Sequence, residues 1–259
     1  GVASRCATEE IFGPVLSLHA FDDEAEACAM ANATPYGLAA IVLTRELARA
    51  HRMAATLDVG LVWINTWMAR DLRVPFGGMR ASGLGREATL AFAALGARVI
   101  LVGRDTAKLA ALRDELTSRH GEDRFPAVLA DMGSLAAVNE AADRILAAES
   151  RLDALVDNAG AIFPDRRDGP DGIEATFALL VVGPFALTAR LLPLLRRAPR
   201  ARVVAVTSGG MYTQRLRLDH LAWDRRPFSG SRAYAHAKRA QVALMREWAR
   251  RLEGGGLSF

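Results

Sequence analysis

The stretch Ala81-Ser82-Gly83-Leu84-Gly85-Arg86-Glu87 divides the sequence into two patterns. Its Gly-x-Gly element stands at the start of a helical pattern, where backbone N–H groups and the helix dipole can bind a diphosphate. Beyond it, helix and strand patterns alternate to about residue 252, which predicts βαβ units and a doubly wound parallel sheet of the α/β class. Ahead of it, residues 1–80 form a separate and shorter αβ pattern. We therefore expect two parts, residues 1–80 and residues 81–259.

The composition is that of a globular protein, with 51% apolar and 24% charged residues in 259 and a mild net charge of +4. The Arg-rich run 196–202 lacks interleaved aromatic residues, so we expect no nucleic-acid partner. The apolar run near Ala175–Ala189 is broken by Gly-Pro and too short to span a bilayer, so we expect no membrane partner. Cys6 and Cys28 suit the cytoplasm and form no metal site.

The periodicity of the apolar residues places the elements of both parts. In the first part we expect a helix capped by Asp23, a strand at 39–44, a helix at 45–57 and a strand at 60–65. In the second part we expect helices at 84–95, 107–119, 134–148, 172–196 and 229–252, with strands at 98–102, 125–129, 152–156 and 201–207. Open parallel sheets bind ligands at the carboxyl ends of their strands, so the residues that follow each strand are site candidates.

Cofactor candidates follow three of these strands. Gly103-Arg104 leaves room for the 2′-phosphate of NADP and supplies a cation for it, which favours NADP over NAD as the cofactor. Asp131 is placed to accept from an adenine amino group, or else to begin the next helix. Asn158-Ala159-Gly160 follows the third strand.

The most specific feature is Tyr234-Ala235-His236-Ala237-Lys238, a Tyr-x-x-x-Lys on an expected helix. The spacing places the phenol and the ammonium on one helix face. A free Tyr has a pKa of about 10, and a neighbouring ammonium favours the phenolate and makes it useful in acid–base catalysis. Ser208, at the end of the preceding strand, is placed to bind a substrate oxygen.

Residues 81–259 together resemble the short-chain dehydrogenase/reductase family. The resemblance implies hydride transfer between NADP and a small-molecule carbonyl or alcohol substrate, and a homo-oligomer. It makes Tyr234 the proton donor and acceptor, assigns the lowering of its pKa and the ribose contact to Lys238, and gives substrate positioning to Ser208. It assigns cofactor binding to Ser82, Gly83, Leu84, Gly85, Asn158, Ala159 and Gly160.

Three features depart from that family's pattern. Met79 replaces the first glycine of the phosphate loop, and no apolar strand precedes it. Leu180 replaces a polar residue that would hold a proton-relaying water. The sequence stops at Phe259, where a further strand should begin. These departures leave an alternative, in which the chain is an inactive hybrid that at most binds a nucleotide.

The missing first strand would lie at the centre of the sheet. Its five or so apolar residues contribute roughly 10 kcal/mol, comparable with the net stability of a whole domain. One replacement is available, because residues 60–65 form an apolar strand pattern that could insert there through a long loop at 66–81.

Residues 1–87 resemble the C-terminal part of the aldehyde dehydrogenases, in particular those that oxidise hydroxymuconic semialdehyde. Four motifs carry the resemblance in order: Glu9-Glu10-Ile11-Phe12-Gly13-Pro14, Asn32-Ala33-Thr34-Pro35-Tyr36-Gly37-Leu38, Gly60-Leu61-Val62-Trp63-Ile64-Asn65, and the glycine-rich run from Pro75 to Glu87. The resemblance assigns the nicotinamide ribose to Glu10, nicotinamide packing to Phe12 and a substrate carboxylate to Arg70. The family's Cys nucleophile and Glu base are not in this sequence, so an aldehyde dehydrogenase remnant is a second alternative.

The two patterns meet in the glycine-rich stretch that both families share, and the sequence begins in mid-pattern without Met, as a fragment would. We hypothesise that two coding sequences were joined through this similarity, by recombination or by misassembly of sequence reads. One uninterrupted gene across the junction, found by long-read sequencing of the source DNA, would refute the hypothesis.

Overall fold

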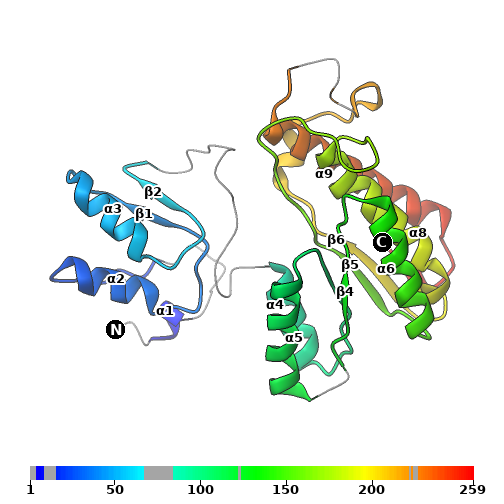
Figure 1. Cartoon of the computed structure of the whole chain (residues 1–259), viewed down its shortest axis with the longest axis horizontal. Helices are drawn as coiled ribbons and strands as arrows, with labels where there is room; N and C mark the ends of the chain where they lie inside the picture. The colour runs from blue at the N-terminus through cyan, green and yellow to red at the C-terminus, as the bar shows by residue number, and fades with distance from the viewer. Residues whose placement is uncertain (1–3, 9–15, 67–83, 122–123, 222, 224–226) are drawn as a thin grey trace. The chain divides into compact units, whose positions relative to one another are not determined.

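The chain folds into two units, Gly1–Ala88 and Thr89–Phe259, as seen in the computed structural model (Figure 1). The structure describes residues 4–8, 16–66, 84–121, 124–221, 223 and 227–259. The helix and strand alternation expected for each unit is present, and it confirms the α/β class with parallel strands.

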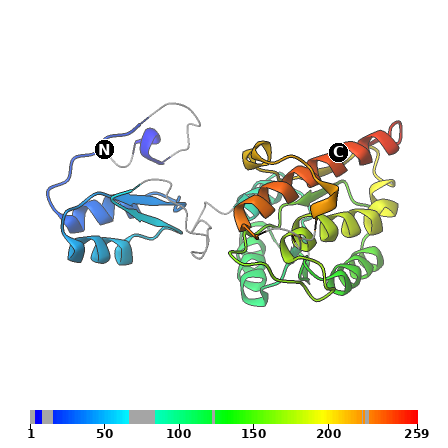
Figure 2. The same ribbon diagram turned by 90° about the horizontal axis from the view of Figure 1, so that it is seen from above.

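The first unit is a two-stranded parallel sheet covered on one side by two helices (Figure 2). Its elements are α1 (Arg5–Thr8), α2 (Glu24–Asn32), β1 (Ala40–Val42), α3 (Leu47–Thr56) and β2 (Val62–Ile64). Asp23 caps α2 as expected, because its side chain accepts from the backbone N–H of Glu26. The core of the unit joins Cys28 of α2 with Val42 of β1 and Leu57 after α3.

The replacement that the sequence allows for the missing central strand is not formed among the described residues. β2, which lies within residues 60–65, pairs in parallel with β1, and Val42 is the register partner of Ile64. Because α3 joins β1 directly to β2, this pairing needs only a local crossover, whereas insertion into the second unit would require the closure of a long loop. The apolar strand therefore belongs to the sheet of the first unit.

The second unit contains the remaining elements, which alternate in the expected order. They are α4 (Leu84–Ala94), β3 (Leu101–Gly103), α5 (Thr106–His120), β4 (Ala127–Leu129), α6 (Leu135–Ala148), β5 (Ala154–Asp157), α7 (Ala175–Phe177), the π-turn η2 (Ala178–Val182), α8 (Gly183–Leu195), β6 (Ala201–Ala205), the 3-10 turns η3 (Gly209–Thr213) and η4 (Leu218–His220), α9 (Gly230–Arg251) and β7 (Leu257–Ser258). α4 crosses the boundary between the two units, and its Leu90 and Ala93, which belong to the second unit, pack with Leu101 of β3 and Leu116 of α5.

The strands of the second unit form two separate parallel sheets. β3 pairs with β4, and β5 pairs with β6, which also pairs with β7. Among the described residues no strand joins β3 to β5, so the central position stays open, as the sequence predicts. Val102 of β3 and Val156 of β5 are each 36% exposed. Strand residues of this type are normally covered in a parallel sheet, but exposure is not confined to the strands at the open centre, since Val204 of β6, which pairs on both edges, is 46% exposed.

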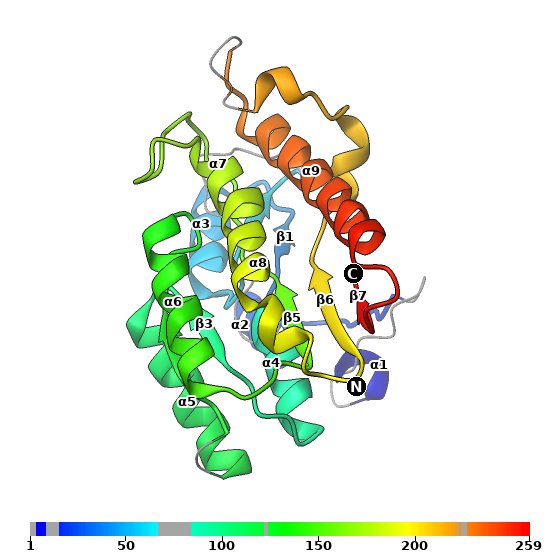
Figure 3. The ribbon, with the colours of Figure 1, turned by 90° about the vertical axis from the view of Figure 1, so that its right-hand side faces the viewer.

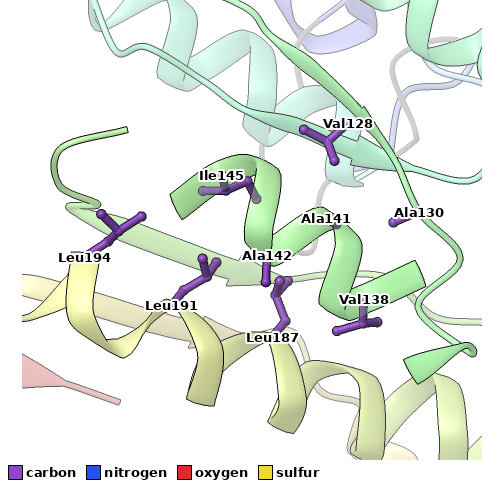
Figure 4. Close-up of a cluster of buried hydrophobic side chains, with 9 residues drawn as sticks. All are labelled: Val128, Ala130, Val138, Ala141, Ala142, Ile145, Leu187, Leu191 and Leu194. Atoms are coloured by element: carbon purple, nitrogen blue, oxygen red, sulfur yellow. The ribbon is translucent and has the colours of Figure 1, made fainter. Parts of the chain in front are cut away.

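Helices rather than strand pairing hold the two sheets in one unit. Val128 of β4 packs in a cluster with Ile145 of α6 and Leu191 of α8 (Figure 4). Leu155 of β5 packs against the same cluster. Successive strand residues point to opposite faces, and Leu101 of β3 accordingly packs with α4 and α5 instead. Figure 3 shows α6, α8 and α9 next to one another across the strands. The helix layer therefore replaces part of the cohesion that the absent strand would supply.

The long helix expected at 172–196 is divided into α7, η2 and α8. Glu174, which is 2% exposed, caps its start by accepting from the backbone N–H groups of Thr176 and Phe177. The expectation that this apolar run is too short is wrong, because the helical segment Ala175–Leu195 is long and apolar enough to cross a membrane by length and composition. However, 61% of its most apolar window is buried inside the protein. It is the central core helix of the unit.

The start of α9 depends on a glycine, and this gives a prediction for stability. A Cβ built on Gly230 would collide with the carbonyl oxygen of Phe163, which is backbone and cannot move cheaply. We expect Gly230→Ala to lower the free energy of unfolding by about 1–3 kcal/mol, as overpacking does in cores, in urea denaturation. Gly209→Ala is the control, because a Cβ there meets nothing within 4 Å. Equal stability of the two variants would contradict the prediction.

Candidate active site

Helix α9 carries the Tyr and the Lys of the expected site on one face. Tyr234 is half-buried and Lys238 is buried, with the ammonium nitrogen of Lys238 5.8 Å from the centre of the Tyr234 ring. The helix begins at Gly230 and packs on η2 and on η3, which follows β6. The i, i+4 spacing places both side chains on one face of α9, and the Lys238 ammonium lies at the carboxyl ends of β5 and β6.

The Lys238 ammonium is fixed by two neutral acceptors. Its Nζ donates to the carbonyl oxygen of Val206 at 2.5 Å and to Oε1 of Gln241 at 3.1 Å, and the residue is only 2% exposed. The same Val206 donates its N–H to the carbonyl oxygen of Asp157 at 3.0 Å. The backbone of Val206 therefore links the Lys238 side chain to the end of β5 through two hydrogen bonds.

Asp157 and Lys238 are both buried, and burial shifts the pKa of each group toward neutral pH. Burial raises the pKa of Asp157 to about 7, against a hydrogen bond from Thr188 and the charge of Lys238, which lower it. Burial lowers the pKa of Lys238 to about 8, against the charge of Asp157, which raises it. For both groups the effect of burial is the largest, so each pKa lies closer to neutral pH than usual. Acid–base groups are most useful when their pKa lies in that range.

Ser208 lies on the chain that leads from β6 to α9. It is half-buried and caps η3, because its Oγ accepts from the N–H of Gly210 at 3.3 Å. The turn is tied to α9, since Arg239 donates to the carbonyl oxygen of Met211 and Thr207 donates to that of Lys238. Ser208 is thus held at the same end of the strands as the Tyr and the Lys.

The expected cofactor residues of the second unit lie at strand ends. Arg104 is exposed after β3, and its guanidinium makes no ion pair or hydrogen bond with another residue that the structure describes. Asp131 follows β4 and accepts from the N–H of Gly133 at 2.8 Å, whereas the cap of α6 is Ser134, whose side chain accepts from the N–H of Ala137. Asn158, Ala159 and Gly160 follow β5, and a Cβ on Gly160 would lie 3.9 Å from Nζ of Lys238.

The remaining expected site residues lie partly or wholly outside the described part of the chain. Gly85 lies in the first turn of α4, and Leu84 is described only as the first residue of that helix. Ser82, Gly83, Glu10, Phe12 and Arg70 all fall outside the described residues.

Leu180 occupies the place where the family pattern expects a polar residue. It is fully buried in η2, and its Cδ2 would lie 3.3 Å from a Cβ on Gly160. The wall of the site near Lys238 is therefore apolar on this side, and it offers no hydrogen bond to a relaying water.

Two polar residues of this site were missed from the sequence. Asp157 directly precedes Asn158 at the end of a strand, which is the signal that could have found it. Gln241 lies one turn after Lys238 on α9, and its Nε2 is buried without a hydrogen-bond partner among the described residues. His236 has a structural role, since its Nε2 accepts from the N–H of Arg217 at 3.0 Å and its ring packs edge-on against Trp223.

Comparison with known proteins divides the chain as its motifs do. The model of the aldehyde dehydrogenase family matches residues 2–94, and the model described as short chain dehydrogenase matches residues 78–220. Over 84 residues the chain is 55% identical to 2-aminomuconic semialdehyde dehydrogenase of Mus musculus, covering 32% of this chain and 17% of that protein. A match to 2-hydroxymuconic semialdehyde dehydrogenase of Pseudomonas sp. (strain CF600) is 55% identical over 89 residues and covers 34% and 18%. The chain spans less than a fifth of these curated relatives.

Solved structures resemble the second unit. A protein of Mycobacterium paratuberculosis is 32% identical with a TM-score of 0.59, covering 67% of this chain and 61% of that one. A short chain dehydrogenase from Salmonella enterica is 28% identical with a TM-score of 0.55, covering 68% and 69%. The Pseudomonas aeruginosa RhlG/NADP active-site complex is 28% identical with a TM-score of 0.54, covering 68% and 65%. With a family model matched over more than half of its length, the chain belongs to the short chain dehydrogenase family, and an aldehyde dehydrogenase segment precedes that part.

Proposed function

We propose that the second unit is an NADP-dependent oxidoreductase that interconverts a small-molecule carbonyl and an alcohol. The observation that carries the proposal is the pairing of Tyr234 with the buried Lys238 on α9, at the carboxyl ends of β5 and β6. Ligands of open parallel sheets bind at this edge. Ser208, which follows β6, completes the set.

The residues of this chain have separate roles in the proposed reaction. A nicotinamide cofactor, held by the residues at the carboxyl ends of the strands, would supply or accept the hydride at the substrate carbon when bound. Tyr234 donates its phenolic proton to the carbonyl oxygen during reduction and takes a proton from the hydroxyl during oxidation. Lys238, as an ammonium, favours the phenolate of Tyr234 and so makes this proton transfer accessible near neutral pH. Ser208 donates a hydrogen bond to the substrate oxygen.

The chemistry of Arg104 fits a phosphorylated nucleotide. Its exposed guanidinium stands after β3, where a 2′-phosphate would take up two parallel hydrogen bonds. The RhlG relative from Pseudomonas aeruginosa was solved as an active-site complex with NADP. We therefore place the 2′-phosphate of NADP on Arg104, with Asn158, Ala159 and Gly160 near the nicotinamide end.

The first prediction concerns nucleotide preference. NADPH should raise the melting temperature of the chain more than NADH does, because ligand binding to the folded state alone stabilises it. Arg104→Ala should weaken NADPH binding by about tenfold or more, as the loss of a charged hydrogen bond does, and leave the NADH effect unchanged. Arg113→Ala is the matched control, because Arg113 is an exposed arginine of α5 that pairs with Asp114. A melt that responds to neither nucleotide would contradict the proposed cofactor site.

The second prediction concerns the acid–base group. Tyr234→Phe removes the phenolic proton and should lower kcat by about a hundredfold or more, with NADPH consumption measured against a panel of aldehydes and ketones. The melting shift with NADPH should persist, because the substitution leaves Arg104 intact. Tyr212→Phe is the control, since Tyr212 is 77% exposed on η3. Equal rates for the two variants would remove Tyr234 from the reaction.

A further inference from the structure

The buried Asp157 is a side chain that the proposed reaction does not use. It is the last residue of β5 and is 5% exposed. Its carbonyl oxygen accepts from Val206, whose own carbonyl accepts from Lys238. The loop that follows it brings Gly160 beside the Lys238 ammonium. The end of β5 and the Lys238 side chain are thus held together by backbone contacts.

Lys238 has only neutral hydrogen-bond partners among the residues that the structure describes. These are the carbonyl of Val206 from the end of β6 and the amide of Gln241 from α9. An ammonium buried among neutral groups tends to lose its proton, because burial penalises the charged form. Burial lowers the pKa of Lys238 to about 8, and the charge of Asp157 opposes this effect.

The groups around the pair come from five elements. α9 presents Tyr234 and Gln241 to Lys238. Val206, which follows β6, contributes its carbonyl. η2 presents the apolar Leu180 beside Gly160. α8 presents Thr188, whose hydroxyl donates to Oδ2 of Asp157 at 3.5 Å. Asp157 of β5 is the carboxylate whose charge acts on Lys238, and the Thr188 hydrogen bond lowers the Asp157 pKa and so favours its charged form.

We propose that Asp157 is a positioning residue whose buried carboxylate, once it has lost its proton, favours the ammonium form of Lys238 beside Tyr234. It acts through Lys238 and touches neither substrate nor nucleotide. The catalytic use of the ammonium rests on the proposed function, whereas the effect of Asp157 on the charge of Lys238 does not. Because Leu180 is apolar, the side chain at position 180 cannot stabilise the charge of Lys238 by a hydrogen bond. This role therefore falls to the Asp157 carboxylate.

The sequence makes a direct test practicable, because it contains only two lysines, Lys108 and Lys238. The chain is labelled at Cε of lysine, and the two NMR signals are followed against pH, with Lys108→Arg to assign them. Asp157→Asn should move the titration midpoint of Lys238 down by about one pH unit or more, as the loss of a nearby opposite charge does. Lys108, whose side chain is 87% exposed, is the internal reference.

Two further variants serve as a control and as a second test. Asp153→Asn makes the same change at an exposed residue just before β5, and it should leave the Lys238 midpoint in place. Thr188→Val removes the hydrogen bond that favours charge on Asp157, so it should move the midpoint down by a smaller amount. This second variant keeps the carboxylate and serves if Asp157→Asn does not fold.

The outcomes separate the two proposals. A Lys238 midpoint that is unchanged in Asp157→Asn, or in Thr188→Val where the first variant does not fold, overturns the role of Asp157. A lowered midpoint in a chain that consumes no NADPH with any carbonyl compound supports the role and refutes the proposed function. A lowered midpoint with a matching shift in the pH profile of kcat supports both.

Thermal stability gives an independent readout of the same carboxylate. The pKa of Asp157 is about 7 in the folded chain against an ordinary value of 3.8. The folded state therefore binds more protons than the unfolded state between these values, and stability should fall as pH rises from about 4 to about 7. Asp157→Asn should remove this part of the slope in the melting temperature, whereas Asp153→Asn should retain it. Equal slopes for the two variants would contradict the buried, raised state of Asp157.

Discussion

The backbone of Val206 joins the parallel sheet to the helix that carries the site. Its N–H continues the pairing of β5 with β6, and its carbonyl accepts from Lys238 of α9. The position of the ammonium therefore depends on the register of two strands, in which Asp157 pairs with Ala205. A slip of one residue would reverse the faces of the strand side chains and disconnect the buried pair.

The open centre of the sheet limits how rigidly this arrangement is supported. β3 and β5 each lack a partner on one edge among the described residues, and valines of both strands are partly exposed. The cluster between α6 and α8 contacts both halves and compensates in part through apolar burial. The Tyr–Lys site lies entirely on the β5–β6 side, whereas Arg104 lies on the β3 side. A nucleotide bound as we propose would therefore contact both halves.

Much of the fold could be predicted because helices and strands have local periodicities. The expected helix at 229–252 appears as Gly230–Arg251, and the expected strand at 152–156 appears as Ala154–Asp157. The π-turn at Ala178–Val182 and the correct partner of β2 were not predicted. Both depend on contacts between residues distant in sequence, which no local period reveals.

The sequence by itself determined the two families, the alternation of elements, and the presence of Tyr234 and Lys238 on one helix face. These follow from motifs and spacings within a few turns of chain. Only the tertiary structure decided that the ammonium of Lys238 is directed to the Val206 carbonyl, that Leu180 lines the same region, and that the charge of Asp157 at the end of β5 acts on Lys238. The reason is physical: burial and long-range charge depend on which distant segments pack together, and these set the protonation of a buried side chain.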